Sequence, residues 1–447
     1  MNERCRIAIV GGGAAGLAAA IFAAEAWDRP DGEASHAPRP PRPAILLLDG
    51  ARKLGAKILV SGGGRCNVTN ETVRAEDFHA SSLPFVRQVL AGFDVPATIA
   101  WFASLGVELQ REEAGKLFPV SQRAATVLEA LLARCEALGV SIRTGCRIEE
   151  IVPMQRADGE GVRTTAPRFA VRHAGGEIEA HAAILATGGR SLPRTGSDGL
   201  GLAIARSLGH TVTPTHPALV PLVLDRSFFH GRLSGLSQVV RLTVLSAGRR
   251  IEEREGGLLW THFGVSGPVV LDASHAWGAA QVRGEEPGIR VSLLREPFEA
   301  AERWLLACAR EAPRRSIGRV VGERLAERLA GALCEHAGID PSTPLAQLGR
   351  DARRRLAHAL SELALPVERT RGWDFAEVTA GGVDLAEIDP RTMESRVQPG
   401  CYLAGEMLDV DGRIGGFNFQ WAWSSGRRAG VAAAAAVRFR EDGERPI

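Results

Sequence analysis

One glycine pattern near the start of the chain limits its fold more than any other feature. Residues 11–16 read GGGAAG, which contains G-x-G-x-x-G; they follow the apolar run Arg6–Val10 and precede an alanine-rich stretch that ends near Trp27. A buried strand, a tight turn and a helix are therefore expected. In such a unit the three glycines serve the turn, the approach to a pyrophosphate and the helix–strand packing, and the helix N-terminus offers N–H groups to phosphate. The residues expected at a bound dinucleotide are Gly11, Gly13, Ala14, Ala15 and Gly16.

A carboxylate is expected after the second strand, where it would bind ribose hydroxyls. The run AILLLD ends at Asp49, which is 33 residues after Gly16 rather than the usual ~20. Residues 28–43 (DRPDGEASHAPRPPRP) are polar, proline-rich and aperiodic, which predicts an exposed loop and explains the longer path. Asp49 suits the ribose of FAD or NAD equally, and an ordinary strand-end aspartate is the alternative.

Three further glycine-rich segments favour FAD. Residues 52–70 (RKLGAKILVSGGGRCNVTN, with Gly62 and Gly63) suit a backbone that wraps a ligand, although a flexible surface loop is the alternative. The apolar run 182–186 ends at Ala186 and leads into Thr187-Gly188-Gly189, at the strand edge where α/β sheets bind ligands. In residues 402–420, Gly405 and Glu406 end a strand, and Gly415-Gly416 precedes a helix whose amides would suit the N1–C2=O side of a flavin. The sequence holds no second G-x-G-x-x-G after a strand, so a nicotinamide would have to dock directly at the flavin.

Composition excludes several classes of protein. The formal net charge of +2 gives no indication of nucleic-acid binding. The sequence contains no apolar run of about 18 residues, so no membrane-spanning helix is expected. No signal-peptide stretch precedes Gly11, so a cytoplasmic location is expected. The seven cysteines form no Cys-x-x-Cys pair and no zinc spacing, so neither a redox disulfide nor a metal site is expected.

The order of patterns predicts an α/β fold with a discontinuous nucleotide domain. With about 150 residues per domain, 447 residues suggest two or three domains. We expect a Rossmann-type FAD-binding domain at 1–195 plus 372–447. Residues 210–294 look strand-like, so an inserted β-rich domain is expected at 196–295 plus 364–371. Residues 298–363 look helical, so a helical subdomain is expected at 296–363.

Longer motifs resemble the BaiN-like family of bacterial NAD(P)/FAD-dependent oxidoreductases. They include KILVSGGGRCNVTN, KLFPVS, ATGGRSLPRTGSDGLGLAIARSLGH, LLWTHFGVSGPVVL and the stretch 378–430. The resemblance covers nearly the whole chain except residues 28–43 and about 295–370, and it implies an FAD domain carrying an inserted β-barrel-like domain and a helical subdomain. Trp260 and Cys401 stand where phenylalanine and leucine are expected, and Trp260 could alter a substrate pocket. The FAD contacts that the resemblance implies are Ala15, Asp49, Lys57, Gly62, Arg65, Cys66, Asn67, Thr69, Thr187, Gly188, Glu406, Asp409, Gly416, Phe417, Asn418 and Gln420.

Two residues are candidate proton donors. Cys66 follows Arg65, which could lower the pKa of the thiol, although a packing residue under the ring is an equal alternative. His262, in THFGVSG, could point at the flavin edge or be a hydrogen-bonded structural histidine. Glu406 and Asp409 are expected to orient the ribityl chain or the phosphates rather than transfer protons.

The resulting hypothesis is a reductase that acts on an activated C=C bond of a small apolar substrate, with hydride passing from NAD(P)H through FAD. A flavoprotein that acts on RNA or another macromolecule is an alternative. Its support is fold analogy and the arginine-rich stretch 310–328, where glutamates offset much of the charge. A non-catalytic FAD-binding protein is a third possibility. The sequence leaves the substrate, the choice of NADH or NADPH and the oligomeric state open.

Overall fold

The computed structural model describes residues 3–28, 45–154 and 168–442, and the chain divides into two compact units. The first unit comprises residues up to 215 and from 378 onward, and the second comprises 216–377. The sequence placed these boundaries at 195 and 372. The loop expected at 28–43 lies, beyond Asp28, outside the described residues.

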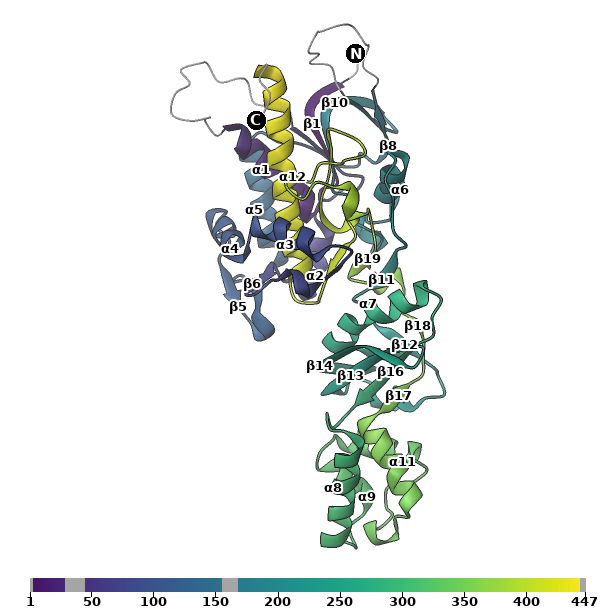
Figure 1. The fold of residues 1–447 in the computed structure, drawn as a ribbon. Coiled ribbons are helices and arrows are strands. Elements are labelled where there is room, and N and C mark those ends of the chain that lie inside the picture. Colours follow the sequence, from purple (N-terminus) through teal and green to yellow (C-terminus); the bar gives the residue numbers. More distant parts are fainter. Residues whose placement is uncertain (1–2, 29–44, 155–167, 443–447) are drawn as a thin grey trace. The chain divides into compact units, whose positions relative to one another are not determined.

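A seven-stranded sheet forms the centre of the first unit (Figure 1). Its order is β7-β2-β1-β10-β9-β8, with β20 also paired to β10. Strands β7, β2, β1, β10 and β20 run parallel, whereas β9 is antiparallel to both β10 and β8. The bounds are β1 (Glu3–Val10), β2 (Ile45–Leu48), β7 (Ser141–Arg143), β8 (Ile148–Pro153), β9 (Phe169–His173), β10 (Gly176–Leu185) and β20 (Cys401–Leu403). The parallel strands end together near Val10 and Leu185, where the glycine-rich segments begin.

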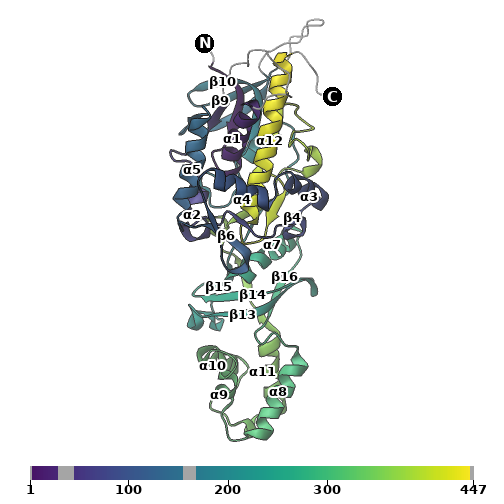
Figure 2. The same cartoon turned by 90° about the vertical axis from the view of Figure 1, so that its left-hand side faces the viewer.

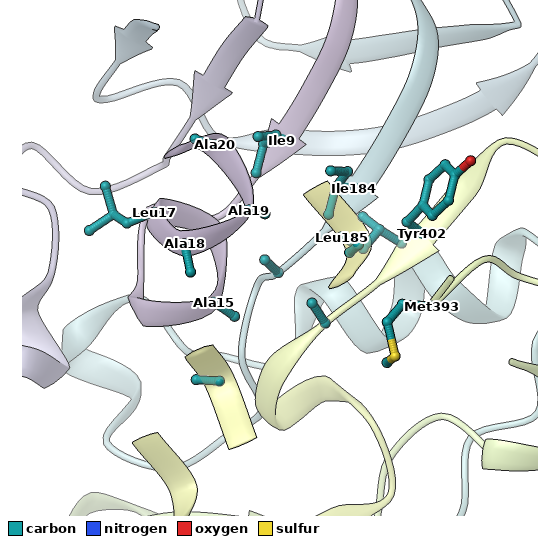
Figure 3. Close-up of a cluster of buried hydrophobic side chains, with 14 of the residues drawn as sticks. Ile9, Ala15, Leu17, Ala18, Ala19, Ala20, Ile184, Leu185, Met393 and Tyr402 are labelled. Carbon is teal, nitrogen blue, oxygen red and sulfur yellow. The ribbon is translucent and has the colours of Figure 1, made fainter. Parts of the chain in front are cut away.

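Two long helices, α1 (Ala14–Asp28) and α12 (Phe417–Asp442), lie side by side in this unit (Figures 1 and 2). A Cβ at Gly426 or Gly430 would overlap the carbonyl oxygens of Ala15 and Ala19, so the two backbones approach closely. The spacing of four residues puts both glycines on one helix face. Figure 3 shows alanines of α1, Ile9 of β1, Ile184 of β10 and Tyr402 of β20 around one buried cluster. This packing fixes the first turn of α1 beside the chain near Gly405.

Shorter elements complete the first unit. The remaining helices are α2 (Ala56–Gly64), α3 (Leu83–Ala91), α4 (Val95–Ser104), α5 (Ala124–Ala137) and α6 (Leu200–Ser207). The helical pattern at 83–105 is thus two helices, because Gly92 ends α3 and the Asp94 carboxylate accepts the Ala97 N–H to begin α4. Small sheets pair β3 (Thr69–Asn70) and β5 (Leu109–Arg111) with β6 (Lys116–Pro119), and β4 (Phe78–Ala80) with β21 (Val410–Gly412). Strand β19 (Val378–Ala380) also belongs to this unit.

The second unit contains an antiparallel sheet and five helices within 216–377. The sheet order is β17-β16-β13-β14-β15-β12-β18. Its strands are β12 (Leu222–Leu224), β13 (Ser237–Ser246), β14 (Arg249–Thr261), β15 (Gly264–Ser266), β16 (Pro287–Ser292), β17 (Leu363–Leu365) and β18 (Val367–Thr370); β11 (His216–Ala218) precedes them. The helices are α7 (Pro268–Val282), α8 (Phe298–Glu311), α9 (Ile317–Gly322), α10 (Glu327–His336) and α11 (Arg350–Ser361).

The second unit corrects one expectation about secondary structure. Residues 268–282 lie in the stretch with a strand-like pattern, but they form α7. Pro268 occupies the first helical turn, and Val270, Ala273 and Trp277 are buried at helical spacing. One apolar core joins residues of the sheet, such as Val240, to residues of the helices, such as Leu333, so the helical segment packs onto the sheet of this unit.

No helix in the described ranges is both long and apolar enough to cross a membrane. All seven cysteines are free in the structure.

Candidate FAD-binding site

The glycines in the turn between β1 and α1 have two different roles. Gly11 has φ 108°, and a Cβ there would overlap the carbonyl oxygen of Ala186; a Cβ at Gly16 would overlap the carbonyl oxygen of Gly11. Both glycines are therefore required by the protein's own packing. A Cβ at Gly13 would meet no atom within 4 Å. Gly13 is thus the open side of the turn, next to the N-terminus of α1 at Ala14, where a phosphate can approach the backbone.

Asp49 lies beside this turn, directly after β2. Its carboxylate accepts the Gly12 N–H at 2.6 Å and the Ala51 N–H at 2.7 Å. A residue 37 positions away along the chain is thereby fixed to the glycine turn. The side chain is only half-buried, so it can also accept a hydroxyl from a ligand.

The last residues of α2 and those that follow it have a left-handed backbone. Gly62, Gly63, Gly64 and Cys66 have φ values of 55°, 69°, 84° and 62°, and the three glycines are exposed. Successive residues with positive φ can turn their N–H groups toward one acceptor, which is a common anion-binding geometry. The next side chain, Asn67, is 8% exposed, yet its Oδ1 has no hydrogen-bond partner among the described residues. A buried amide oxygen without a donor indicates a missing ligand or water.

Cys66 is not the low-pKa thiol that the sequence suggested. The side chain is fully buried, and burial raises the pKa of the Cys66 thiol to about 12. Arg65 does not lower this pKa, because its guanidinium lies over Phe118, 4.1 Å from the ring centroid, and pairs with Glu112 at 2.9 Å. Gln122 also accepts a hydrogen bond from Arg65. Arg65 therefore ties the glycine-rich loop to the β5–β6 hairpin.

Alkylation should distinguish the two interpretations of Cys66. We expect iodoacetamide at pH 8 to modify the partly exposed Cys308 well before Cys66 in the folded protein, because only an accessible thiolate reacts. Peptide mass spectrometry over time measures both sites in one sample. Modification of Cys66 at least as fast as Cys308 would show that the buried thiol is a reactive group after all.

A partly buried ion pair joins four distant segments of the first unit. Lys57 Nζ lies 2.6 Å from Glu406 Oε2 and 2.7 Å from Ser191 Oγ. The other carboxylate oxygen accepts Ser191 Oγ–H at 2.7 Å and the Thr379 N–H at 2.9 Å. Burial opposes ionisation of Glu406, but the Lys57 charge and these hydrogen bonds outweigh it and lower the pKa. Lys57 and Glu406, both expected FAD contacts, thus contact each other.

Ser191 and Thr379 were not identified as site residues from the sequence. Thr379 is fully buried, and its Oγ1 accepts the backbone N–H groups of Arg190 and Ser191 at 2.7 and 3.1 Å. Both residues stand inside the glycine-containing segments ATGGRS and VTAGG, but no local pattern links them to Glu406. The pair fixes the Thr187-Gly188-Gly189 turn, since a Cβ at Gly189 would overlap Thr379.

Other predicted residues surround this turn. Ala186 donates its N–H to Val10, and Gly188 has φ 71°. Thr187 packs against Gly201 and the Met407 sulfur, so its side chain is engaged within the protein. Gly405 has φ 78° and lies against the methyl group of Ala15.

Asp409 is an acidic group with an unusual pKa. Burial, together with the charges of Asp411 and Asp384, raises the pKa of Asp409 to about 6, although a hydrogen bond from Thr213 opposes this. Its own N–H donates to Val383. This carboxyl group therefore titrates closer to neutral pH than an ordinary aspartate does.

The pKa of Asp409 gives a stability prediction. Because the folded pKa of about 6 exceeds the unfolded value of 3.8, the folded state binds the proton more tightly, and stability is lost as pH rises from about 4 to 6. Asp409→Asn should therefore match the wild type near pH 4 and exceed it by about 1–3 kcal/mol at pH 8. Urea unfolding of FAD-free protein measures this, with the exposed Asp374→Asn as control. An equal gain at both pH values would contradict it.

The start of α12 is fixed by amide side chains. Gly416 has φ 97°, and its Cα lies against the backbone of Thr69. Asn418 exchanges two hydrogen bonds of 2.8 Å with the backbone of Gly412, and Phe417 packs edge-on against Phe78. Gln420 is fully buried; its Oε1 accepts Thr69 Oγ1–H, and its Nε2 donates to Phe93, Thr98 and Ser424. The side chain of Gln420 thus holds the helix in place and is not directed at a ligand.

His262 lies in the second unit, in the turn between β14 and β15. Its side chain is exposed, and its ring lies 5.1 Å from that of Phe263. Trp260 is fully buried in the core of the same unit. The role of His262 as a proton donor remains a prediction.

The residues of the first unit fit FAD. The open face of Gly13, the glycine-rich segment at 62–66 and the unpartnered Asn67 oxygen offer backbone N–H groups and polar atoms to a phosphate-linked ligand. Asp49 stands where a ribose binds in such folds. The α12 N-terminus offers a partial positive charge that suits a flavin ring.

Comparisons with known proteins identify the family to which the chain is related. The family model described as the HI0933-like protein Rossmann domain matches residues 5–432. The chain is 36% identical, over 96% of its length and 99% of the relative, to the 3-dehydro-bile acid delta(4,6)-reductase of Clostridium scindens. It is 33% identical, over 95% of its length and 96% of the relative, to the ribosomal RNA dihydrouridine synthase of Escherichia coli. Among solved structures, the 3-ketosteroid delta1-dehydrogenase of Sterolibacterium denitrificans is similar with a TM-score of 0.49 and 13% identity, covering 97% of this chain and 100% of that one.

Proposed function

Because this chain belongs to the HI0933-like Rossmann-domain family of flavoproteins, we propose that it reduces a C=C bond conjugated to a carbonyl group, with hydride supplied by NAD(P)H through FAD. The chain is an FAD-dependent oxidoreductase. The observation that carries the finer proposal is the 36% identity, over almost the full length of both chains, to a reductase that is named for a 3-dehydro-bile acid substrate. A small apolar enone is the corresponding substrate class here.

The protein's part in this reaction is to hold the cofactor and to stabilise charge. Bound FAD accepts and donates hydride, and this is the chemistry that the cofactor supplies. Gly13, the loop at 62–66 and Asn67 would hold its phosphates and polar edges, and Asp49 would hold its ribose. The amides that follow Gly416 at the start of α12 would stabilise negative charge on the reduced ring.

Anaerobic stopped-flow absorbance tests the proposal. The purified holoprotein is mixed with NADH or NADPH, and bleaching of the flavin band measures transfer into FAD. The reduced protein is then mixed with a 3-oxo-Δ4 steroid, and recovery of the band with formation of the saturated product measures transfer out. No bleaching by either nucleotide would exclude them as donors, and failure with every donor would favour a non-catalytic FAD-binding protein.

RNA is a second candidate substrate, and one observation favours it. The Escherichia coli relative at 33% identity is named a ribosomal RNA dihydrouridine synthase. Dihydrouridine is uridine with the ring C=C bond saturated, and that bond is conjugated to a carbonyl group, so the two candidates share one chemistry. Reduced protein should then be reoxidised by ribosomal RNA but not by the steroid, with an affinity that falls steeply as salt rises.

The arginine-rich helices of the second unit give RNA only weak support. Arg315 pairs with Glu323, and Arg324 pairs with Glu296. Arg232 also pairs with Glu335 at 2.6 Å. These carboxylates neutralise part of the local arginine charge, which weakens the case for a phosphate-binding surface.

A further inference from the structure

Lys116, the first residue of β6, is a half-buried cation without a carboxylate partner among the described residues. The N–H of Glu112 donates to the Lys116 carbonyl oxygen at 2.8 Å, but the Glu112 carboxylate pairs with Arg65 at 2.9 Å. The carboxylate of Glu71, on the neighbouring strand segment, pairs with Arg111 at 2.7 Å. Because the removal of an unpaired charge from water is unfavourable, such a lysine indicates that an acceptor binds beside it.

The pairing of β3 with β6 determines the direction in which the Lys116 side chain leaves the sheet. Asn70 and Lys116 lie directly opposite each other in this antiparallel pair, so their side chains share one face, with Cβ atoms about 5 Å apart. The side-chain amide of Asn70 donates to the Gly415 carbonyl oxygen at 3.1 Å. The face that carries Lys116 is therefore the face that contacts the chain just before α12.

The backbone of β3 fixes the same sheet to the beginning of α12. A Cβ at Gly416 would lie 2.5 Å from the carbonyl group of Thr69, so the two backbones are in close contact, and α12 begins at the next residue, Phe417. The side chain of Lys116 has a flexible four-carbon stem, which allows its ammonium group to reach the space in front of the free N–H groups of this helix. Lys116 and the N-terminus of α12 therefore offer positive charge to one region of the first unit.

The surroundings of Lys116 differ from those of the other lysines. Three of the 54 basic residues in the sequence are lysines, namely Lys53, Lys57 and Lys116. Lys57 pairs with Glu406 at 2.6 Å, and Lys53 is exposed to solvent. Lys116 alone among the three is partly buried without an ion pair in the described part of the chain. Lys53 therefore provides a matched control, because it carries the same charge in a solvated position.

We propose that Lys116 holds its ammonium group beside the N1–C2=O side of the bound flavin ring and thereby raises the reduction potential of FAD. The inference rests on the proposed function, which puts this side of the ring at the N-terminus of α12. The N1–C2=O side gains negative charge when the flavin is reduced, whereas the oxidised ring is neutral. A cation fixed there stabilises the reduced form more than the oxidised form, which favours hydride transfer from the donor into FAD.

The midpoint potential of the bound flavin tests this role without a hydride donor or a substrate. The FAD-loaded protein is reduced stepwise with dithionite in the presence of a reference redox dye, and the absorbance of flavin and dye gives the potential. Lys116→Met should lower the equilibrium constant for reduction of the bound flavin about 10- to 100-fold, because a nearby opposite charge changes such equilibria by this order. For a two-electron couple this corresponds to a potential that is about 30 to 60 mV lower.

Three control measurements separate the charge of Lys116 from other effects. Lys116→Arg keeps the charge and should change the equilibrium constant less than about twofold. Lys53→Met removes a charge that water and salt already screen, so it should also change the constant less than about twofold. The affinity of Lys116→Met for oxidised FAD should change less than about threefold, because the oxidised ring is neutral. Circular dichroism verifies folding, and Lys116→Gln is a second uncharged variant in case methionine disturbs the fold.

Different failures have different meanings. Equal potentials for the wild type and Lys116→Met would overturn the role of Lys116, even if NAD(P)H reduces the flavin, and would leave the N-terminus of α12 as the source of stabilisation. An equal fall in potential for Lys116→Arg and Lys116→Met would also overturn it, because the effect would not depend on charge. A fall in potential that is specific to the uncharged variants, in a protein that NAD(P)H cannot reduce, would support the role of Lys116 and refute the proposed donor.

Discussion

Gly13→Ala should give a folded protein that binds FAD about 100-fold more weakly than the wild type. A Cβ at this position meets no protein atom within 4 Å, and the φ of Gly13 lies outside the left-handed region, so the fold accommodates alanine. The methyl group would instead occupy the space through which the pyrophosphate reaches the backbone N–H groups. Loss of two charge-assisted hydrogen bonds is worth about 3 kcal/mol, which is roughly 100-fold in Kd. Flavin fluorescence titration of FAD-free protein measures the change.

Gly16→Ala is the matched control for Gly13→Ala. Alanine is intrinsically the better residue inside a helix, by about 1 kcal/mol. Its Cβ at position 16 would nevertheless overlap the carbonyl oxygen of Gly11, and backbone cannot move aside as a side chain can. We expect Gly16→Ala to lose solubility or thermal stability before FAD is added, and Gly13→Ala to keep both. If Gly13→Ala bound FAD normally, the pyrophosphate could not lie at this turn.

The parts of the site that could be predicted are those that local sequence determines. The turn at 11–16 was predictable because strand, glycines and helix are contiguous, and each glycine has its own steric reason. Asp49 was predictable in spite of the long preceding segment, because it ends an apolar strand. The final helix was predictable from Gly415-Gly416 and the alanine-rich residues that follow.

The errors have physical causes that lie outside local sequence. Cys66 follows Arg65, but adjacency in the chain does not set the direction of a side chain. The guanidinium turns to Glu112, 47 residues away, while the thiol is buried. Helix α7 was missed because a short apolar run is compatible with a buried strand or a buried helix, and only the packing of Trp277 and its neighbours decides.

The contacts of Glu406 with Lys57, Ser191 and Thr379 are the largest part of the site that could not be predicted from the sequence. Its partners Lys57 and Ser191 lie 349 and 215 residues away in the chain. Each residue by itself is an unremarkable polar side chain in a glycine-rich motif. Their contacts exist only because the fold brings together α2, the turn after β10, β19 and the segment at 405–407. The fold therefore joins polar residues from four separate segments into one charged cluster.

Breaking the ion pair between Lys57 and Glu406 should strongly reduce both the stability of the protein and its affinity for FAD. Glu406→Gln should lower the free energy of unfolding of FAD-free protein by about 3 kcal/mol, because it leaves the Lys57 ammonium group partly buried without its anion. The side chains of Lys57 and Glu406 are only 24% and 19% exposed, so water replaces little of the lost attraction. The same substitution should weaken FAD binding, since the Thr187-Gly188-Gly189 turn loses its support. Urea unfolding and flavin titration measure the two effects.

A double-mutant cycle separates the ion pair from general damage to the fold. Lys57→Met should also destabilise the protein, but Lys57→Met combined with Glu406→Gln should cost at least 1 kcal/mol less than the two single changes together, because no unpaired charge remains. The control is Glu76→Gln. Its carboxylate lies 2.6 Å from Arg87, the same distance as between Lys57 and Glu406, but the two side chains are 58% and 63% exposed, so no measurable change is expected. Strict additivity of the Lys57 and Glu406 substitutions would mean that the pair is not energetically coupled, and that the conformation of the turn depends on Ser191 and Thr379 instead.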